Sequence, residues 1–470
     1  MTGLAQPLTL ETALELIAEL RALVAQQAKR IAELEEKVRK DSSNSSKPPS
    51  SDGPSKKRKY PEKKRTGRKR GGQPGHKKHE RTMLPVEQAR SVTEVKPSSC
   101  ERCGKPLQGE DPCPKRHQIV DLPPIVPVFD EYRMHTISCE DAACGHRTEA
   151  NLPKGVSTIG FGPGVDAMVG QVAGEMRASK RTTAETMTKV FGVPMSVGAV
   201  IDAQNRVSKA LGEPCAAALK HVQEQTIKNA DETPWKEGQS KAYIWVGVTA
   251  FVTAFVIQTS RAATAAGVLL GTVVGILGTD RYSGYAWWPA AQRQVCWAHL
   301  IRDFTAIAER GGSSKVLGDA VLAEAKRMFA WWKRLREGEL KRSTFQVYMR
   351  SVRQRVDELV EEGRQDENPS TAGTCEKMWK VRQAFWTFVN VDGVEPTNNA
   401  AEQALRFGVL WRKMCYGTKS AAGSVFVARI LTTHATLRQQ GRSVHEFLRA
   451  ACVAHRAGTA PPSLLPNSDG

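Results

Sequence analysis

Three acidic residues of this 470-residue chain combine the residue type and the setting that metal-dependent chemistry requires. Asp231 and Asp280 each follow a short β-prone run, which places them at strand ends, and Glu402 lies on a strong helical pattern. Two strand ends and one helix can bring three carboxylates to a pair of divalent metal ions, the arrangement that supports in-line attack on a phosphodiester. Magnesium suits such a site because it prefers oxygen ligands. The three residues therefore predict phosphoryl transfer on nucleic acid.

Each of these residues also has a structural interpretation. An aspartate that follows a strand can cap a turn, and Glu402 could form a salt bridge with Arg406 one helical turn later. The joint placement of the three residues favours the catalytic interpretation. The acidic residues best able to replace one of them are Glu232, Asp303 and Glu395.

The segments around the acidic residues predict the elements that would position them. Strands are expected over residues 241–260 and again up to Asp280, because both runs are rich in β-branched residues. Helices are expected over residues 261–270 and from His299 onward. Long charged helices over residues 310–390 separate the second acidic residue from the third. The chain is therefore predicted to be a multidomain α/β protein whose catalytic domain has a ribonuclease-H-like mixed sheet with a helical insertion.

The chain carries a formal net charge of +19, and more than half of this excess lies in one tract. Residues 56–81 contain thirteen Lys or Arg residues and two Glu residues. A basic tract with Gly and Pro but no apolar period does not build a core and suits a polyanion. DNA, RNA and an anionic membrane are the candidate partners, and a solvated linker is the alternative.

A heptad pattern runs through the N-terminal segment. Apolar residues recur at seven-residue intervals from Leu10 to Val38, with Leu20 and Leu34 at the complementary positions. Mainly β-branched residues at the first position and leucine at the fourth favour a parallel two-stranded coiled coil. We therefore expect a homodimer or higher oligomer formed through residues 8–40. A helix packed on its own protein is the alternative.

Four of the ten cysteines form two closely spaced pairs, Cys100 with Cys103 and Cys139 with Cys144. Two pairs of thiolates can close a tetrahedral structural zinc site. The sequence therefore predicts a zinc-binding module over residues 89–152, and free cysteines in an ordinary β domain are the alternative. The other candidate zinc ligands are Cys113, His117, His135 and His146.

Residues 160–220 are predicted to be helical. One helix is expected over residues 182–190, and Ser196 is a suitable N-cap for the next helix after a short glycine-containing turn. Two helices joined in this way are typical of a helix-turn-helix DNA reader. Any helical hairpin gives the same pattern, so both interpretations stay open.

No segment is typical of a membrane span or of a secretory signal. The apolar runs 242–257 and 262–278 are shorter than the roughly 20 residues of a spanning helix. Glu11, Glu15 and Glu19 interrupt the N-terminal repeat, which is wrong for a signal peptide. We therefore expect a cytoplasmic protein with reduced or metal-bound thiols.

The motifs of the chain occur in a recognisable order. The heptad helix precedes Ser-Ser-Asn-Ser-Ser-Lys-Pro-Pro, a basic tract with Gly-Gln-Pro-Gly-His, and the cysteine module. Asp-Glu-Thr at Asp231, Asp-x-Tyr-x-x-Tyr at Asp280, Cys-x-Ala-His-x-x-Arg and Asn-Asn-x-x-Glu at Glu402 then follow. In this order and over nearly its whole length, the chain resembles DDE transposases of the insertion sequence 66 family.

The resemblance implies that Asp231, Asp280 and Glu402 hold two Mg²⁺ or Mn²⁺ ions in a ribonuclease-H-like domain. It implies hydrolysis at the ends of a mobile element and attack of the freed 3′ hydroxyl on target DNA. It also implies a location at the bacterial nucleoid and companion proteins encoded by the same element. The candidates for contact with DNA are Lys63, Lys64, Arg68, Arg70, His299, Arg302, Asn399, Arg406, Arg412 and Lys413.

Two other functions are compatible with these motifs, a structure-specific DNA nuclease and a non-catalytic zinc-containing DNA-binding protein. The predicted segments are a coiled-coil helix (8–40), a disordered Ser/Pro and basic linker (41–88), the zinc module (89–152), a helical DNA-binding segment (160–220), the catalytic domain (221–440) and a C-terminal helix and tail (441–470).

Overall fold

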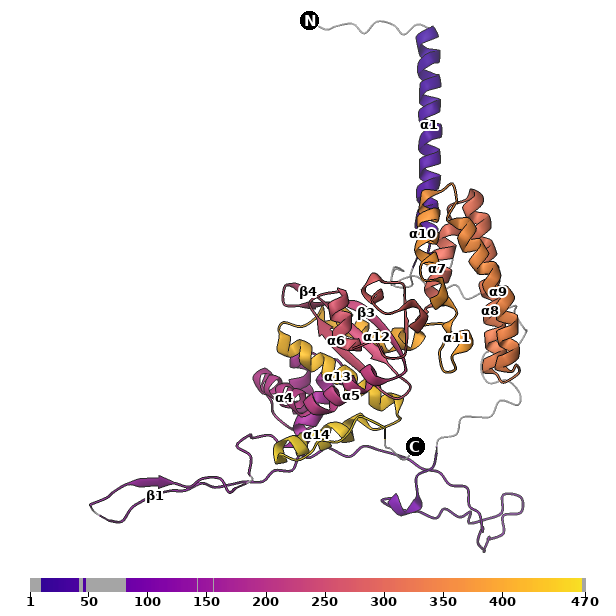
Figure 1. The fold of residues 1–470 in the computed structure, drawn as a ribbon. Helices are drawn as coiled ribbons and strands as arrows, with labels where there is room; N and C mark the ends of the chain where they lie inside the picture. Colours follow the sequence, from indigo (N-terminus) through magenta and orange to yellow (C-terminus); the bar gives the residue numbers. More distant parts are fainter. Residues whose placement is uncertain (1–9, 42–44, 48–81, 142, 155, 467–470) are drawn as a thin grey trace, which may run out of the picture. The chain divides into compact units, whose positions relative to one another are not determined.

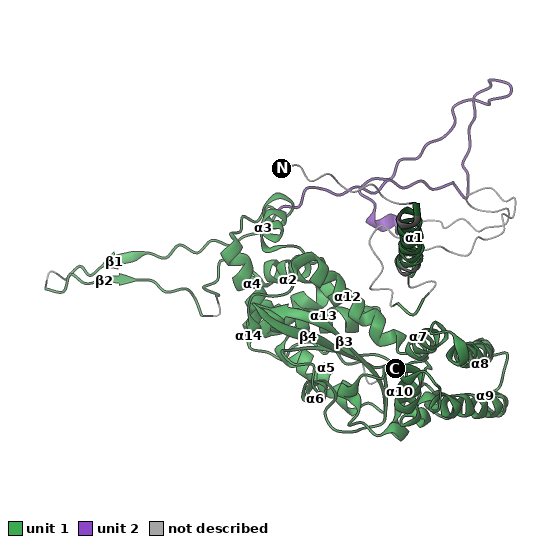
Figure 2. Cartoon of the chain, turned by 90° about the horizontal axis from the view of Figure 1, so that it is seen from above, with its two compact units in different colours: residues 1–56, 127–470 green, residues 57–126 purple. Residues whose placement is uncertain are grey.

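A computed structural model describes residues 10–41, 45–47, 82–141, 143–154 and 156–466. The chain forms two compact units, one of residues 57–126 and one of residues 1–56 together with 127–470 (Figure 2). The whole basic tract, residues 56–81, lies outside the described residues, as do the predicted DNA contacts Lys63, Lys64, Arg68 and Arg70.

The larger unit contains a five-stranded mixed sheet (Figure 1). Its strands lie in the order β5-β4-β3-β6-β7. Strands β5, β4 and β3 pair antiparallel, whereas β6 pairs in parallel with both β3 and β7. The prediction of an α/β chain with a mixed sheet is therefore confirmed. The strands are β3 (Ile227–Glu237), β4 (Ser240–Val248), β5 (Thr253–Gln258), β6 (Ile276–Thr279) and β7 (Arg293–Val295).

Strand β3 continues past the first of the three predicted carboxylates. The sequence-based placement of Asp231 at a strand end is wrong, because β3 pairs with β4 from Asn229 to Glu237. Pro234 lies inside this strand. It is tolerated because β6 pairs with β3 only as far as Asn229, which leaves one edge of β3 without a neighbouring strand at the proline. Asp280 follows the last residue of β6, as predicted.

Helices cover both faces of the sheet. Because alternate residues of a strand point to opposite faces, Ile244 and Val246 of β4 pack in a cluster with α12 and α13, whereas Trp245 packs with α6. Gly408 permits a close approach of α12, since a Cβ atom there would lie 3.1 Å from Cδ1 of Ile244. These helices are α12 (Asn399–Cys415), α13 (Ala421–Gln439) and α6 (Ala263–Leu270).

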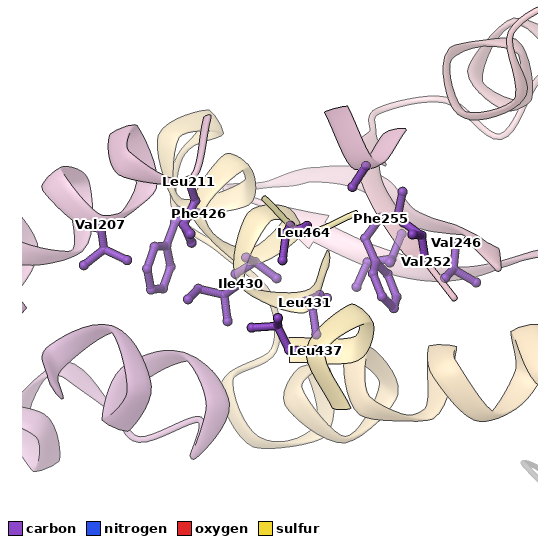
Figure 3. Close-up of a cluster of buried hydrophobic side chains, with 14 of the residues drawn as sticks. Val207, Leu211, Val246, Val252, Phe255, Phe426, Ile430, Leu431, Leu437 and Leu464 are labelled. Carbon is purple, nitrogen blue, oxygen red and sulfur yellow. The ribbon is translucent and has the colours of Figure 1, made fainter. Parts of the chain in front are cut away.

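The largest core joins the sheet to α13 and to helices that precede the sheet. Figure 3 shows Val246 and Phe255 from the strands, Ile430 and Leu431 from α13, and Val207 from α4 (Val197–Ala210) in this core. Each fully buried side chain of this kind contributes about 1.5–3 kcal/mol relative to exposure. The helices before the sheet therefore share a core with the sheet itself.

The predicted helical hairpin is present before the sheet. Oγ of Ser196 accepts a hydrogen bond from the backbone N of Ala199 at 3.1 Å, which confirms its role as an N-cap. Asp166, which is 1% exposed, accepts hydrogen bonds from Arg206 of α4 and Arg456 of α14 and so links α2, α4 and α14. The elements are α2 (Pro163–Gly170), the π-helix η3 (Gln171–Glu175), α3 (Lys180–Lys189), α4 (Val197–Ala210), α5 (Gly212–Glu224) and α14 (Val444–Ala457).

The residues between β7 and α12 form a second helical layer with its own core. The first helix begins at Trp297, two residues before the predicted start. Trp297, Trp332, Phe345 and Phe388 belong to one buried cluster, and Nε1 of Trp297 donates a hydrogen bond to the carbonyl of Phe385 at 2.8 Å. The elements are α7 (Trp297–Ala308), α8 (Gly312–Arg336), α9 (Arg342–Gly363), α10 (Pro369–Trp379), η6 (Arg382–Phe385) and α11 (Thr387–Asn390).

The heptad segment forms one continuous helix, α1 (Leu10–Arg39), as predicted. Its apolar residues Leu20 and Val24 are 51% and 63% exposed in the single chain. None of the helices in the described residues is both long and apolar enough to cross a membrane. The remaining short elements are η2 (Val86–Gln88), β1 (Thr136–Ser138), β2 (Arg147–Glu149), η4 (Ser283–Tyr285) and η5 (Ala290–Gln292).

Candidate active site

The sheet register places the two predicted aspartates side by side. In the parallel pair of β3 and β6, Asn229 lies opposite Gly278. Asp231 lies two residues beyond Asn229 in β3, and Asp280 lies two residues beyond Gly278, just past the end of β6, so continuation of this register aligns the two aspartates. Asp231 also lies opposite Val246 of β4, whose side chain packs on the face covered by α12. Both aspartates therefore lie on the face of the sheet that α12 covers.

Glu402 reaches the same region from the first turn of α12. The electrostatics of Asp231 show that the three carboxylates are neighbours. The pKa of Asp231 is raised to about 8, first by burial, then by the charges of Glu232 and Asp280, with a smaller contribution from Glu402. A buried carboxyl group with several acidic neighbours disfavours its own anion. The three residues thus form one electrostatically coupled group.

None of the three carboxylates is paired with a lysine or arginine among the described residues. Oδ1 of Asp231 accepts a hydrogen bond from the backbone N of Glu232 at 2.9 Å, and Oδ1 of Asp280 accepts one from the backbone N of Tyr282 at 2.9 Å. Oε1 of Glu402 lies 3.6 Å from Nδ1 of His299. The salt bridge between Glu402 and Arg406, the structural alternative, is not formed between these two described residues.

Two of the three competing carboxylates are already paired. Glu232 points to the opposite face of the sheet, where Arg261 donates to its Oε1 at 2.6 Å and the Tyr285 hydroxyl donates to its Oε2 at 2.6 Å. Asp303 pairs with Arg281 through two guanidinium nitrogens. These pairings favour Asp231, Asp280 and Glu402 as the acidic residues free to bind a cation.

Asn398 connects the start of α12 to the strands that carry the aspartates. Its side chain is 1% exposed, and its Nδ2 donates to the carbonyl of Ala230 at 2.8 Å. Its backbone N donates to Sγ of Cys296 at 3.2 Å. Sequence reasoning singled out the neighbouring Asn399, which is exposed. The adjacent pair of asparagines was the available signal, but it did not show which one is buried.

Arg293 is a second positioning residue that sequence reasoning missed. It is 4% exposed, and its Nη2 donates to Oγ1 of Thr279 and to the carbonyl of Asp280, both at 3.1 Å. These hydrogen bonds hold the backbone at the end of β6, next to Asp280. An arginine in a short apolar run gives no sequence signal of this role.

His299 and Arg302 lie beside the carboxylates on α7. With Asp280 and Tyr282 they line a hollow of about 470 Å³. The pKa of His299 is lowered, chiefly by burial and then by the positive charge of Arg302, although Asp280 and Glu402 oppose this. Its imidazole is therefore neutral near pH 7, and both residues lie where a substrate could contact them.

The three predicted contacts further along α12 differ in their surroundings. Arg412 donates to Oγ1 of Thr233 at 3.1 Å and to the carbonyl of Pro234, so it joins α12 to β3. Burial lowers the pKa of Arg412. Arg406 and Lys413 are exposed and remain available to a polyanion.

A cavity of about 670 Å³ adjoins the site between α8 and the start of α12. Aromatic rings, cationic groups and amides line it together, a combination that suits a nucleic acid strand. Two carboxylates, from Glu337 and Glu395, also line it. The aromatic, cationic and amide residues are Phe329, Trp332, Lys333, Arg336, Asn229, Asn399 and Gln403.

The carboxylate oxygens of Asp231, Asp280 and Glu402 are suitable ligands for a divalent cation. Oxygen donors are the ligands that Mg²⁺ and Mn²⁺ prefer. Oε1 of Glu402 is buried and has no hydrogen-bond partner, and the raised pKa of Asp231 marks a position where an added positive charge would be favourable. Asp231, Asp280 and Glu402 are the residues that would hold such ions.

The paired cysteines lie on two turns, one in each compact unit. In the first turn, Gly104 has a φ of +71°, and its N donates to the carbonyl of Cys100 at 2.8 Å. The pKa of the Cys100 thiol is lowered by hydrogen bonds from the backbone N–H groups of Arg102 and Cys103. In the second turn, the backbone N of Cys139 donates to the carbonyl of His146 at 2.8 Å, and Cys144 lies near the far end of the turn.

Comparisons with known proteins agree with the resemblance. A family model described as "Transposase IS66 family" matches residues 180–425, a span that includes the sheet, all three carboxylates and the inserted helices. A model of a family of unknown function, DUF6444, matches residues 5–82. No curated protein matches the chain.

The raised pKa of Asp231 predicts a stability that depends on pH. Between the ordinary aspartate pKa of about 4 and the folded value of about 8, the unfolded chain loses this proton before the folded chain does. Stability from this group is therefore lost as pH rises through that window. In chelator, Asp231→Asn should raise the free energy of unfolding at pH 8.5 by about 1–2 kcal/mol, and by less at pH 5.5.

Thermal unfolding of both proteins at the two pH values tests this prediction. Asp303→Asn is the matched control, because it removes a carboxylate paired with Arg281 and should lower the melting temperature. A lower melting temperature for Asp231→Asn at pH 8.5 would contradict the prediction.

Proposed function

The chain belongs to the IS66 family of transposases, and on this premise we propose that it is a DDE-type transposase in which Asp231, Asp280 and Glu402 hold two Mg²⁺ or Mn²⁺ ions. Membership of the family makes the protein an enzyme that acts on DNA. In the proposed reaction, the enzyme cleaves DNA strands at the ends of a mobile element. It then joins the freed 3′ hydroxyl to target DNA.

The observation that carries this proposal is the alignment of Asp231 with Asp280 beneath the first turn of α12. The parallel register of β3 and β6 supports the alignment of the two aspartates. The raised pKa of Asp231 supports the proximity of Asp280 and Glu402. Glu232, the other carboxylate whose charge raises the pKa of Asp231, is paired with Arg261.

The sheet topology supports a ribonuclease-H-like assignment for this part of the chain. Three antiparallel strands are followed by a helix and by two strands parallel to the first strand of the sheet. The helices α8 to α11 then lie in the chain between the second carboxylate and α12. We propose that they are the insertion of this domain and that the cavity beside α8 accommodates a DNA strand.

The residues around the carboxylates would position them and the substrate. When bound, the metal ions would supply positive charge for the attacking and leaving oxygens of the phosphodiester. Asn398 holds Glu402 near the strands by anchoring the start of α12 to Ala230, and Arg293 holds the backbone of Asp280. His299 and Arg302 line the neighbouring hollow, where they can contact a phosphate or the end of a strand.

The alternative enzymatic function is a nuclease that stops after hydrolysis, and the non-enzymatic alternative is a zinc-containing DNA-binding protein. Strand transfer separates the first from a transposase, because only a transposase joins a pre-cleaved 3′ end to a second DNA molecule. Any cleavage of DNA by the protein excludes the second alternative, a DNA-binding protein without catalytic activity.

We predict that Asp231→Asn, Asp280→Asn and Glu402→Gln each abolish Mg²⁺-dependent cleavage and joining of element-end DNA. Removal of a single metal-holding carboxylate should lower the rate by at least about a thousandfold, while DNA binding persists. Glu395→Gln is the matched control, because this exposed carboxylate lines the neighbouring cavity and should not hold metal. A wild-type cleavage rate in any of the three variants would remove that residue from the site.

We also propose a structural zinc ion bound by Cys100, Cys103, Cys139 and Cys144. The support is the spacing of the two pairs and the first turn, where backbone N–H groups favour a thiolate at Cys100. A metal ion here would supply much of the folding energy of a module with little core of its own. Cys100→Ser with Cys103→Ser should therefore lower the zinc content of the purified protein by one ion per chain, and equal zinc content in metal analysis would contradict the proposal.

We propose that residues 56–81 bind DNA phosphates without reading sequence. Each phosphate contact contributes about 0.9 to the log–log dependence of binding on salt. Deletion of residues 56–81 should therefore weaken binding to end DNA and to random DNA by similar factors and flatten both salt slopes. Deletion of the Ser/Pro segment 42–51, with its single lysine, is the control. Loss of end preference alone, with random-DNA affinity unchanged, would show that the tract reads sequence.

We propose that α1 forms a parallel coiled-coil dimer, which would hold two active sites together on two element ends. Its exposed apolar residues at heptad spacing support this. Sedimentation of the full chain should show a dimer, which Leu20→Asp with Leu34→Asp converts to a monomer. Ala22→Asp, on the opposite face of the helix, should leave the dimer intact. A wild-type chain that is monomeric at every concentration tested would contradict the proposal.

A further inference from the structure

Beside the acidic group, three potential metal ligands of a different chemical kind converge. Sγ of Cys296, a ring nitrogen of His299 and a carboxylate oxygen of Glu402 all lie within 4.8 Å of one another. Among the described residues, this is the one group in which three Cys, His, Asp or Glu ligand atoms come so close together. We propose that Cys296, His299 and Glu402 form a second metal site that binds Zn²⁺, and that zinc bound there inhibits the enzyme by engaging Glu402.

The local fold explains why these three residues meet. Val295 of β7 lies opposite Thr279 of β6. The residues that follow these two, Cys296 and Asp280, therefore lie side by side just past the strand ends. Cys296 then precedes α7, and His299 follows three residues later in its first turn. Glu402 approaches from α12, whose start is held against the cysteine by the hydrogen bond from the backbone N of Asn398 to Sγ.

The distances suit tetrahedral zinc. Zinc bonds of about 2.0–2.3 Å at tetrahedral angles place neighbouring ligand atoms about 3.3–3.8 Å apart. Nδ1 of His299 and Oε1 of Glu402 are already 3.6 Å apart. The thiol needs only a small rotation or shift to complete such a set, because the upper limit for all three atoms is 4.8 Å.

Two of the three ligand atoms have no other partner. Nδ1 of His299 and Oε1 of Glu402 are both buried and make no hydrogen bond. Buried polar atoms in proteins nearly always have a partner, so two that face each other without one indicate a shared ligand. The backbone N–H of Asn398 points at Sγ of Cys296, and such a contact stabilises a thiolate ligand.

The donor set selects the metal. Thiolate and imidazole are softer ligands than the oxygens that Mg²⁺ prefers, and with one carboxylate they are typical of zinc. Three protein ligands leave the fourth position open. On binding, the thiol proton leaves to solvent and the Sγ–metal bond replaces the S–H bond.

Glu402 is the residue that both sites would use. Inhibition by zinc rests on the proposed function. Zinc bound to Glu402 can inhibit the enzyme only if Glu402 is also needed to hold Mg²⁺. Zinc at low concentration would thus compete with magnesium, since the sulfur and nitrogen donors give the softer ion an advantage that excess Mg²⁺ cannot match at this site.

Zinc binding tests the site in the full chain. The wild-type protein, Cys296→Ala and a matched control, Cys375→Ala, are equilibrated with Zn²⁺ by dialysis and their metal content is measured. Cys375 is a fully buried cysteine in the core of the inserted helices, away from the other two ligands. We expect Cys296→Ala to bind one zinc ion per chain fewer than the other two proteins, and any zinc held by Cys100 and its partners contributes equally to all three.

Two further measurements serve as controls for the zinc-binding experiment. Circular dichroism and thermal unfolding check that each variant is folded, and His299→Gln should also lose one zinc ion if the histidine is a ligand. Equal zinc content in the wild type, Cys296→Ala and His299→Gln overturns the site. Because zinc content does not depend on catalysis, this outcome differs from a failure of the proposed transposase activity.

Inhibition tests the consequence. With Mg²⁺ in excess, Zn²⁺ should inhibit cleavage by the wild type and Cys375→Ala at concentrations at least about tenfold lower than for Cys296→Ala, with each rate normalised to that protein's own zinc-free rate. Equal inhibition of all three overturns the regulatory role.

Discussion

Burial of the Asp231 carboxylate among other acidic groups is the constraint on which the rest of this site depends. Asp231 lies within β3, aligned with Asp280 and close to Glu402, and its pKa is raised to about 8 by burial and by its acidic neighbours. Such a group costs stability when ionised unless a cation joins it. The fold therefore contains a position where positive charge is favourable, which is the requirement for a site that must acquire its metal ions from solution.

The surrounding structure makes Asp231, Asp280 and Glu402, and not the other nearby carboxylates, the residues that need a cation. Arginine side chains pair with Glu232 and Asp303, so these acidic residues add little demand for a cation. Asn398 and Arg293 hold the backbone around α12 and the end of β6. The inserted helices are anchored to the same region through Trp297 and their own aromatic core. The rigid parts of the chain thus position the acidic group, and the proposed zinc ligands use the same supports.

Sequence patterns predicted the parts of this arrangement that depend on local residue type. The strands around residues 241–260, the helix of Glu402 and the N-cap at Ser196 follow from hydrophobic period and capping chemistry, and the structure confirms them. The position of Asp231 within a long strand was missed, because the β-prone run before it does not show how far the strand continues. Pro234 is acceptable in this strand because that edge of β3 has no neighbouring strand at the proline. Long-range contacts such as those of Asn398 and Arg293, and the meeting of Cys296 with Glu402 across the chain, depend on tertiary packing that no local pattern contains.

The central claim is that the aligned aspartates and the glutamate of α12 together hold the catalytic ions. Anomalous diffraction from crystals of the full chain grown with Mn²⁺ and element-end DNA tests it most directly. The account predicts manganese peaks in contact with Asp231, Asp280 and Glu402. Crystals of a cleavage-competent complex with manganese bound elsewhere, and with none at these three carboxylates, would contradict it.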